Sequence, residues 1–168
     1  AIGYKHGANV LWQLLSTEKD LKCAVLLHGA GWNTYNGVNK WENEGFTFDD
    51  KKRGFLSCLD AHAYAQYVEC PILFMASTNS RKFDFDRCCD TLKRVKEGTT
   101  KIYNFAPSYD RGLDCACSLD EELFLSKFLK EKNVPVHQNV ELTVSKKGNT
   151  LYFSLEGVDD GVKSVRVY

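Results

Sequence analysis

The pentapeptide GYKHG, residues Gly3 to Gly7 of this 168-residue chain, is a weak signal by itself, and the sequence around it makes it a strong one. Its two glycines directly precede the segment 8–16, in which apolar residues recur at helical spacing. A turn of this pattern between a strand and a helix holds its middle residue in strained backbone geometry at the carboxyl edge of a sheet. Small flanking glycines let the helix and the strand pass closely. The residue raised by this turn is a lysine, Lys5.

Downstream of the turn, short apolar runs alternate with helical segments. Strands are predicted at 23–29, 70–77 and 100–107, and helices at 8–16, 55–68, 85–98 and 118–133. The last helix opens on a capping-box pattern, Ser118 followed by Glu121. The stretch 29–54 has no clear period and is interpreted as a long connection or cap. This alternation predicts an α/β fold with a parallel sheet.

The sequence pattern changes after Pro135, where segments of alternating apolar and polar residues, typical of strands, are separated by the turns KKGN and DDG. We therefore predict one domain over 1–133 and a β-rich extension over 134–168 that is itself truncated, because the chain stops while still reading as a strand. The chain also opens without a methionine, just before the turn. We expect a fragment of a longer protein, in which the strand preceding the turn is missing and one apolar sheet edge is unpaired.

Composition excludes several classes of function. Lys+Arg and Asp+Glu balance at 22 each, so no strong field favours nucleic acid or an anionic membrane, and no apolar run is long enough to span a bilayer. The seven cysteines are odd in number and several lie in apolar contexts, which favours reduced thiols in a cytoplasm. They lack the paired spacing that structural zinc prefers, so neither a metal nor a cofactor is expected.

Three segments carry a resemblance to a known superfamily. They are IGYKHGANVLWQLLSTEKDLKCAVLLHGAGW from Ile2, LDAHAYAQYVECPILFMASTNSRKFDFDRCCDTL from Leu59, and YNFAPSYDRGLD from Tyr103. The chain resembles the C-terminal half of an α/β-hydrolase and is most similar to bacterial acetyl xylan esterases and dienelactone-hydrolase-like proteins. The resemblance implies a partial α/β-hydrolase parallel sheet with flanking helices, followed by a small antiparallel β extension. It also implies descent from short-acyl carbohydrate esterases.

The resemblance places the family's catalytic nucleophile, acid and base at Lys5, Ser80 and Arg111, and all three are substituted. An ordinary lysine is protonated at neutral pH and is not nucleophilic. Serine cannot orient an imidazole as a carboxylate does, and arginine is always protonated and cannot act as a general base. We therefore expect a catalytically inactive relative.

Two other functions stay open. An active carboxylic-ester hydrolase with a displaced triad could use His6 or His28 with a carboxylate such as Asp84, or Lys5 itself as a desolvated amine nucleophile. Both histidines could equally be structural. An inactive gene product without a selected role is a further reading.

A binding scaffold is the second alternative, with a small carbohydrate or an anion as the ligand. Trp32 and neighbouring aromatics of the connection could stack on a sugar ring or fill the cap's own core. Two cations in one cleft, Lys5 and Arg111, would favour an anion, unless Lys5 pairs with an aspartate such as Asp110.

Overall fold

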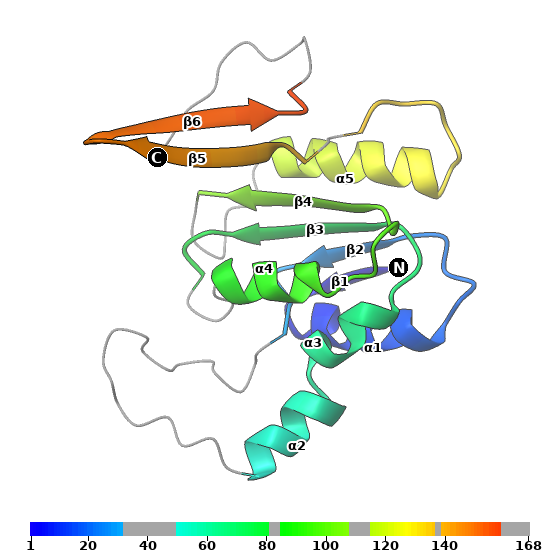
Figure 1. Cartoon of the computed structure of the whole chain (residues 1–168). Helices are drawn as coiled ribbons and strands as arrows, with labels where there is room; N and C mark the ends of the chain where they lie inside the picture. The colour runs from blue at the N-terminus through cyan, green and yellow to red at the C-terminus, as the bar shows by residue number, and fades with distance from the viewer. Residues whose placement is uncertain (32–49, 81–84, 108–114, 137–138, 159–168) are drawn as a thin grey trace. The chain divides into compact units, whose positions relative to one another are not determined.

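The computed structural model describes residues 1–31, 50–80, 85–107, 115–136 and 139–158, and two compact units divide the chain, Ala1–Val136 and His137–Tyr168 (Figure 1). The strands of the first unit are β1 (Ile2–Tyr4), β2 (Ala24–Leu27), β3 (Ile72–Ser77) and β4 (Lys101–Ala106). Its helices are α1 (His6–Thr17), α2 (Asp50–Cys58), α3 (Ala61–Tyr64), the 3₁₀ turn η2 (Ala65–Tyr67), α4 (Phe85–Lys93) and α5 (Cys115–Phe128). The second unit contains β5 (Glu141–Lys147) and β6 (Thr150–Glu156).

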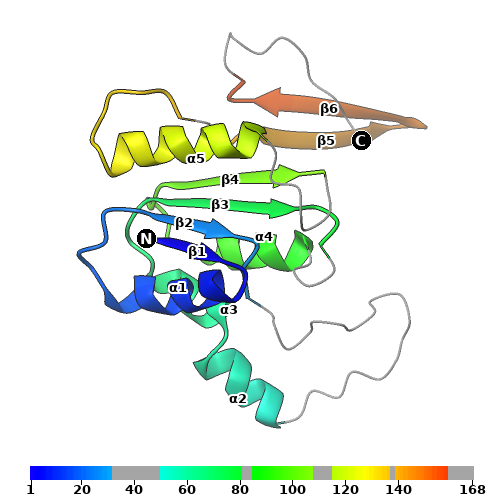
Figure 2. The same ribbon diagram turned by 180° about the vertical axis from the view of Figure 1, so that it is seen from behind.

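Among the described residues of the first unit, four strands form one parallel sheet in the order β1-β2-β3-β4. Helices α1, α3 and α4 cover one face and α5 covers the other, as the two opposite views show (Figures 1 and 2). Alternate residues of β3 enter the two cores, with Phe74 packing in the cluster of Trp12 and Met75 in that of Phe124. The sheet is therefore covered on both faces, which parallel pairing requires.

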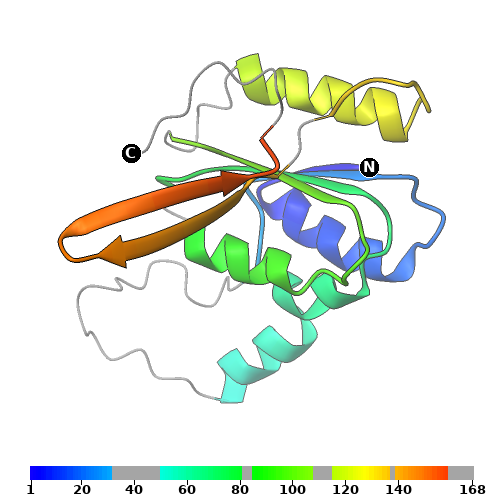
Figure 3. The ribbon, with the colours of Figure 1, turned by 45° about the horizontal axis from the view of Figure 1, so that its top comes forward.

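Strand β3 shows why the apolar runs become strands. All six of its residues are buried, which is the pattern of a strand in the middle of a covered sheet. Figure 3, tilted forward, shows the helices on either side of the sheet. The predicted fold class is confirmed, because the chain has a parallel sheet with flanking helices and a separate antiparallel β unit.

The strand before the turn is present, which corrects the expectation that it is missing. Strand β1 is only three residues long, yet it pairs in parallel with β2, from Ile2 opposite Val25 to Tyr4 opposite Leu27. Its short length gave no periodic signal in the sequence. The sheet edge on this side is therefore β1 and not β2.

Two helix ends also differ from the prediction. Helix α5 begins at Cys115, so Ser118 lies inside its first turn and the capping-box reading is wrong. Helix α4 ends at Lys93, and Gly98, with φ of 87°, serves the turn before β4 instead of the end of the helix.

The second unit is an antiparallel hairpin in which Glu141 lies opposite Glu156 and Lys147 lies opposite Thr150. Gly148 has a φ of 60°, which suits the first position of a two-residue hairpin loop. The predicted third strand of this extension falls in 159–168, outside the described residues.

Candidate functional site

The sharp turn at Lys5 is the centre of the candidate site. Lys5 lies between the end of β1 and the start of α1 with φ of 51° and ψ of −112°, a strained conformation for a residue with a side chain. Its amide N–H donates to the carbonyl of Leu27 at 2.7 Å, and its own carbonyl accepts from Ala8 and Asn9 at 3.0 and 3.2 Å. The turn is thus tied both to β2 and to the first turn of the helix.

Close packing at the turn depends on glycines at two positions. A Cβ added to Gly3 would lie 2.7 Å from the Cα of Ala8, and one added to Gly29 would lie 2.3 Å from the carbonyl oxygen of Lys5. No atom lies within 4 Å of a Cβ added to Gly7. The strand and helix therefore pass closely at Gly3 and Gly29, whereas the expectation that Gly7 shares this role is wrong.

The side chains of Lys5, Tyr4 and His28 form a small cluster at the carboxyl ends of β1 and β2. The Lys5 ammonium lies 5.1 Å from the centroid of the Tyr4 ring, at the range of a cation–π contact. The His28 ring meets Tyr4 edge-on, with centroids 5.9 Å apart. Tyr4 is half exposed, whereas His28 is 1% exposed and has a φ of 56°. Sequence reasoning did not single out Tyr4, although it stands within the pentapeptide.

The remaining predicted residues divide into described and undescribed positions. His6 is exposed and is the first residue of α1. It directly follows Lys5, and in a nucleophile turn the backbone N–H at this position is a donor to the oxyanion. Ser80 is partly buried just beyond β3, in a segment where the N–H of Thr78 donates to the carbonyl of Ala106 at 2.9 Å. Strand β3 pairs in parallel with β2, so Ser80, which follows β3, lies at the carboxyl end of the sheet, as the turn does. Trp32, Asp84, Asp110 and Arg111 lie outside the described residues.

Hydrogen bonds fix the segment that follows β2. The N–H of Gly31 donates to the Thr91 hydroxyl at 3.0 Å, and the Thr91 hydroxyl donates to the carbonyl of Arg87 at 3.0 Å. The Trp12 indole N–H donates to the carbonyl of Gly29 at 2.9 Å. The bonds from Gly31 and Trp12 are buried, and they hold the segment after β2 against α1 and α4 and so fix the position of Gly29 beside the turn.

Solved structures identify the architecture. The chain matches the acylaminoacyl peptidase of Pyrococcus horikoshii with a TM-score of 0.59 at 16% identity, over 81% of this chain and 25% of the peptidase. The fold is that of an α/β-hydrolase. A puromycin hydrolase matches this chain with a TM-score of 0.61 at 15% identity, over 81% of this chain and 23% of that one.

Acetyl xylan esterase 1 from Thermoanaerobacterium sp. is also similar to this chain, with a TM-score of 0.58 at 11% identity, over 74% of this chain and 44% of the esterase. This chain therefore spans about a quarter of the length of the peptidase and less than half of the esterase. No protein-family model matches the sequence, and neither does any curated protein. The structural neighbours are thus esterases and peptidases that share this fold.

The described parts of the chain add two negative findings. No helix there is long and apolar enough to cross a membrane. Within the same ranges, no group of three or more histidine, cysteine, aspartate or glutamate side chains is arranged to hold a metal ion.

Proposed function

We propose that this protein is a catalytically inactive relative of the short-acyl and acetyl xylan esterases, one that keeps the α/β-hydrolase architecture without its chemistry. One observation carries the proposal. Lys5 has strained backbone geometry between β1 and α1, and we assign it to the position from which this fold raises its nucleophile. In this assignment the backbone geometry of a nucleophile turn surrounds a residue whose side chain carries neither a hydroxyl nor a thiol.

The surroundings of Lys5 favour a cation over a nucleophile. The Lys5 ammonium lies over the Tyr4 ring in a cation–π contact, and an ammonium group has no lone pair with which to attack. The side chain is also only partly buried, so it does not lie in the kind of apolar pocket that activates amine nucleophiles. Lys5 is accordingly not an amine nucleophile in this proposal.

A displaced triad is the competing function, and the position of His28 argues against its simplest form. A general base must come within hydrogen-bond reach of the proton it removes. His28 is 1% exposed and packs edge-on against Tyr4, so a substrate bound over the turn cannot approach its ring. In the proposed assignment Ser80 and Arg111 stand at the acid and base positions, where neither can act in that role.

The test is ester hydrolysis with matched variants. The protein and its Lys5→Met, Lys5→Ser and His6→Asn variants are assayed with 4-nitrophenyl acetate and acetylated xylo-oligosaccharides, and each is treated with a fluorophosphonate probe. We expect rates at solvent background throughout and no labelling of the unmodified protein. Lys5→Ser alone should not restore turnover, because a base to activate the hydroxyl is still lacking.

Turnover above background that disappears in Lys5→Met would overturn the proposal and make Lys5 part of an active site. Turnover that survives Lys5→Met but disappears in His6→Asn would also overturn it and would indicate a displaced triad. Thermal unfolding of each variant shows whether a lost signal reflects a lost fold. Lys5→Met retains most of the side-chain length and removes only the charge, which makes it the matched control.

A further inference from the structure

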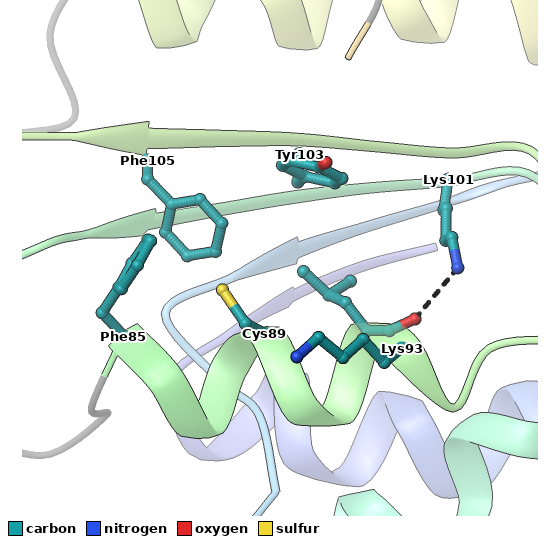
Figure 4. Close-up of a pocket in the computed structure, with 7 residues that line it drawn as sticks. Phe85, Cys89, Lys93, Lys101, Tyr103 and Phe105 are labelled. Carbon is teal, nitrogen blue, oxygen red and sulfur yellow. Dashed lines mark hydrogen bonds between the residues drawn. The ribbon is translucent and has the colours of Figure 1, made fainter. Parts of the chain in front are cut away.

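A cavity of about 340 Å³ lies between α4 and β4, which stands at one end of the strand order (Figure 4). Pockets that take small organic ligands begin at roughly this size. Helix α4 lines the cavity with Phe85, Cys89 and Leu92, and β4 lines it with Tyr103 and Phe105. Because β1 stands at the other end of the strand order, this cavity is separate from the turn between β1 and α1.

Three of the lining residues are aromatic. The centroid of Phe105 lies 4.6 Å from that of Phe85, with the two rings inclined at 77°, and 6.0 Å from that of Tyr103, with an inclination of 52°. Figure 4 shows the Phe85 and Phe105 rings next to each other and Tyr103 farther along the strand. Because the rings are steeply inclined, they present both edges and faces, and a further planar ring can pack against them edge-to-face or offset.

The wall of the cavity is partly fixed by the core and partly open to water. Phe105 also packs against Phe74, a fully buried residue of β3, with ring centroids 5.8 Å apart. Phe85 is the first residue of α4 and is 45% exposed. A ligand that covers the Phe85 ring would therefore remove apolar surface from water, which favours binding.

The charged groups of the lining already have partners. The Lys101 ammonium donates to the carbonyl of Leu92 at 3.3 Å, the dashed line in Figure 4. The Lys93 ammonium lies 3.6 Å from a carboxylate oxygen of Asp90 on the same helix. Burial raises the pKa of the Cys89 thiol, so this group is uncharged near neutral pH. An anionic ligand would have to displace these oxygen partners, and a cationic ligand would meet two ammonium groups. An uncharged ligand avoids both penalties.

We propose that the cavity between α4 and β4 binds a small, uncharged, planar aromatic molecule that packs against Phe85, Tyr103 and Phe105. A saturated molecule of the same size would bury similar apolar area, but it would lack the edge-to-face and offset ring contacts. Planarity and aromatic character therefore set the affinity, and the two lysine side chains contribute only their aliphatic stems. The proposal does not depend on the function assigned to the turn.

The experiment uses 2-naphthamide as the probe, titrated into the ¹⁵N-labelled chain. We expect the amide signals of Cys89, Leu92 and Phe105 to shift together with one binding curve. The saturated analogue decahydro-2-naphthamide should bind roughly two- to tenfold more weakly, because it lacks the ring contacts. The anion 2-naphthoate should also bind severalfold more weakly, because its carboxylate loses hydration and both ammonium groups are already paired.

Variants separate the ring contacts from general apolar burial. Phe85→Leu removes one ring but keeps an apolar side chain at an exposed position, so the fold should be retained. It should weaken naphthamide binding roughly two- to tenfold and leave the decahydro analogue nearly unchanged. Phe55→Leu is the matched control, since Phe55 is a partly exposed ring on α2 that does not line the cavity, and binding should be unaffected. Cys89→Phe fills the cavity and should abolish binding of every probe while the rest of the spectrum is retained.

Four results would overturn the proposal. Binding of the decahydro analogue as tight as that of 2-naphthamide would show that only apolar area matters. Binding of 2-naphthoate as tight as that of 2-naphthamide would refute the preference for an uncharged ligand. Equal losses in Phe55→Leu and Phe85→Leu, or shifts confined to residues outside the cavity, would show that the probe binds elsewhere.

Discussion

Substituting alanine for each glycine around the turn tests which of these glycines the turn needs for close packing of the strand against the helix. In Gly29→Ala the new methyl group would lie 2.3 Å from the carbonyl oxygen of Lys5 and 2.4 Å from the Cβ of Ala8. Neither neighbour is the end of a flexible side chain, so the strand and helix must separate. Overpacking of this kind costs about 3 kcal/mol, the upper end of the usual range.

Gly3→Ala should be similarly costly, because its methyl group would meet only backbone atoms, including the Cα of Ala8 at 2.7 Å. Gly7→Ala is the matched control, since the added methyl group has open space and alanine favours a helix interior by roughly 0.5–1 kcal/mol. For a chain of this length, roughly 2–4 °C of melting temperature corresponds to 1 kcal/mol. Gly29→Ala should therefore melt roughly 6–12 °C lower and Gly7→Ala slightly higher than the unmodified chain.

Thermal unfolding followed by circular dichroism, with urea unfolding at 25 °C as a second measure, decides the matter. The reasoning would be refuted by a Gly29→Ala variant as stable as the unmodified chain. A Gly7→Ala variant as unstable as Gly3→Ala would equally refute it, because the two glycines would then share a role that the geometry denies to one of them.

Two further outcomes follow from the buried polar groups. Burial raises the pKa of the Cys23 and Cys70 thiols, so their contribution to stability is complete below the ordinary thiol pKa of about 8.5 and is lost as pH rises above it. The free energy of unfolding should therefore fall above that pH. The double variant Cys23→Ala, Cys70→Ala should show a shallower fall than Cys58→Ala, which removes an exposed thiol and serves as the control. Trp12→Phe removes the indole N–H that donates to the buried carbonyl of Gly29, and urea unfolding should show a loss of about 1–3 kcal/mol, with no loss indicating that the bond is dispensable.

The sheet could be predicted from the sequence because its strands are continuous apolar runs. The run that became β3 is buried at every position, so its apolar character reports its surroundings directly. Strand β1 could not be predicted, because three residues carry no period and its pairing with β2 depends on a segment about twenty residues later. The start of α5 failed for a related reason, since Ser118 offered a local capping pattern that the longer helix overrode.

The candidate site was predictable in outline and not in its contacts. The pentapeptide, together with the helical and apolar segments that follow it, indicated the position of the turn and its middle residue, because glycines near a strand-to-helix junction allow close approach of the backbone. The essential partner Gly29 was not foreseen, since it lies far from the turn in sequence and meets it only after β2 pairs with β1. The packing of His28 against Tyr4 depends on that same pairing.

At the turn, the residues whose packing sets the path of the backbone are different from the residue whose side chain could react with a substrate. Gly3, Ala8 and Gly29 set the backbone path through contacts that tolerate no added carbon, whereas the side chain at position 5 is only partly buried. In the proposed assignment, a lysine therefore stands at the position of a nucleophile without disturbing the packing that creates that position. The strained φ of 51° still carries a cost of order 1–3 kcal/mol, which the surrounding hydrogen bonds to Leu27, Ala8 and Asn9 must sustain. The close packing at Gly3 and Gly29 is consequently evidence for the fold at this turn, whereas hydrolysis there would need a nucleophile at residue 5 together with a base to activate it.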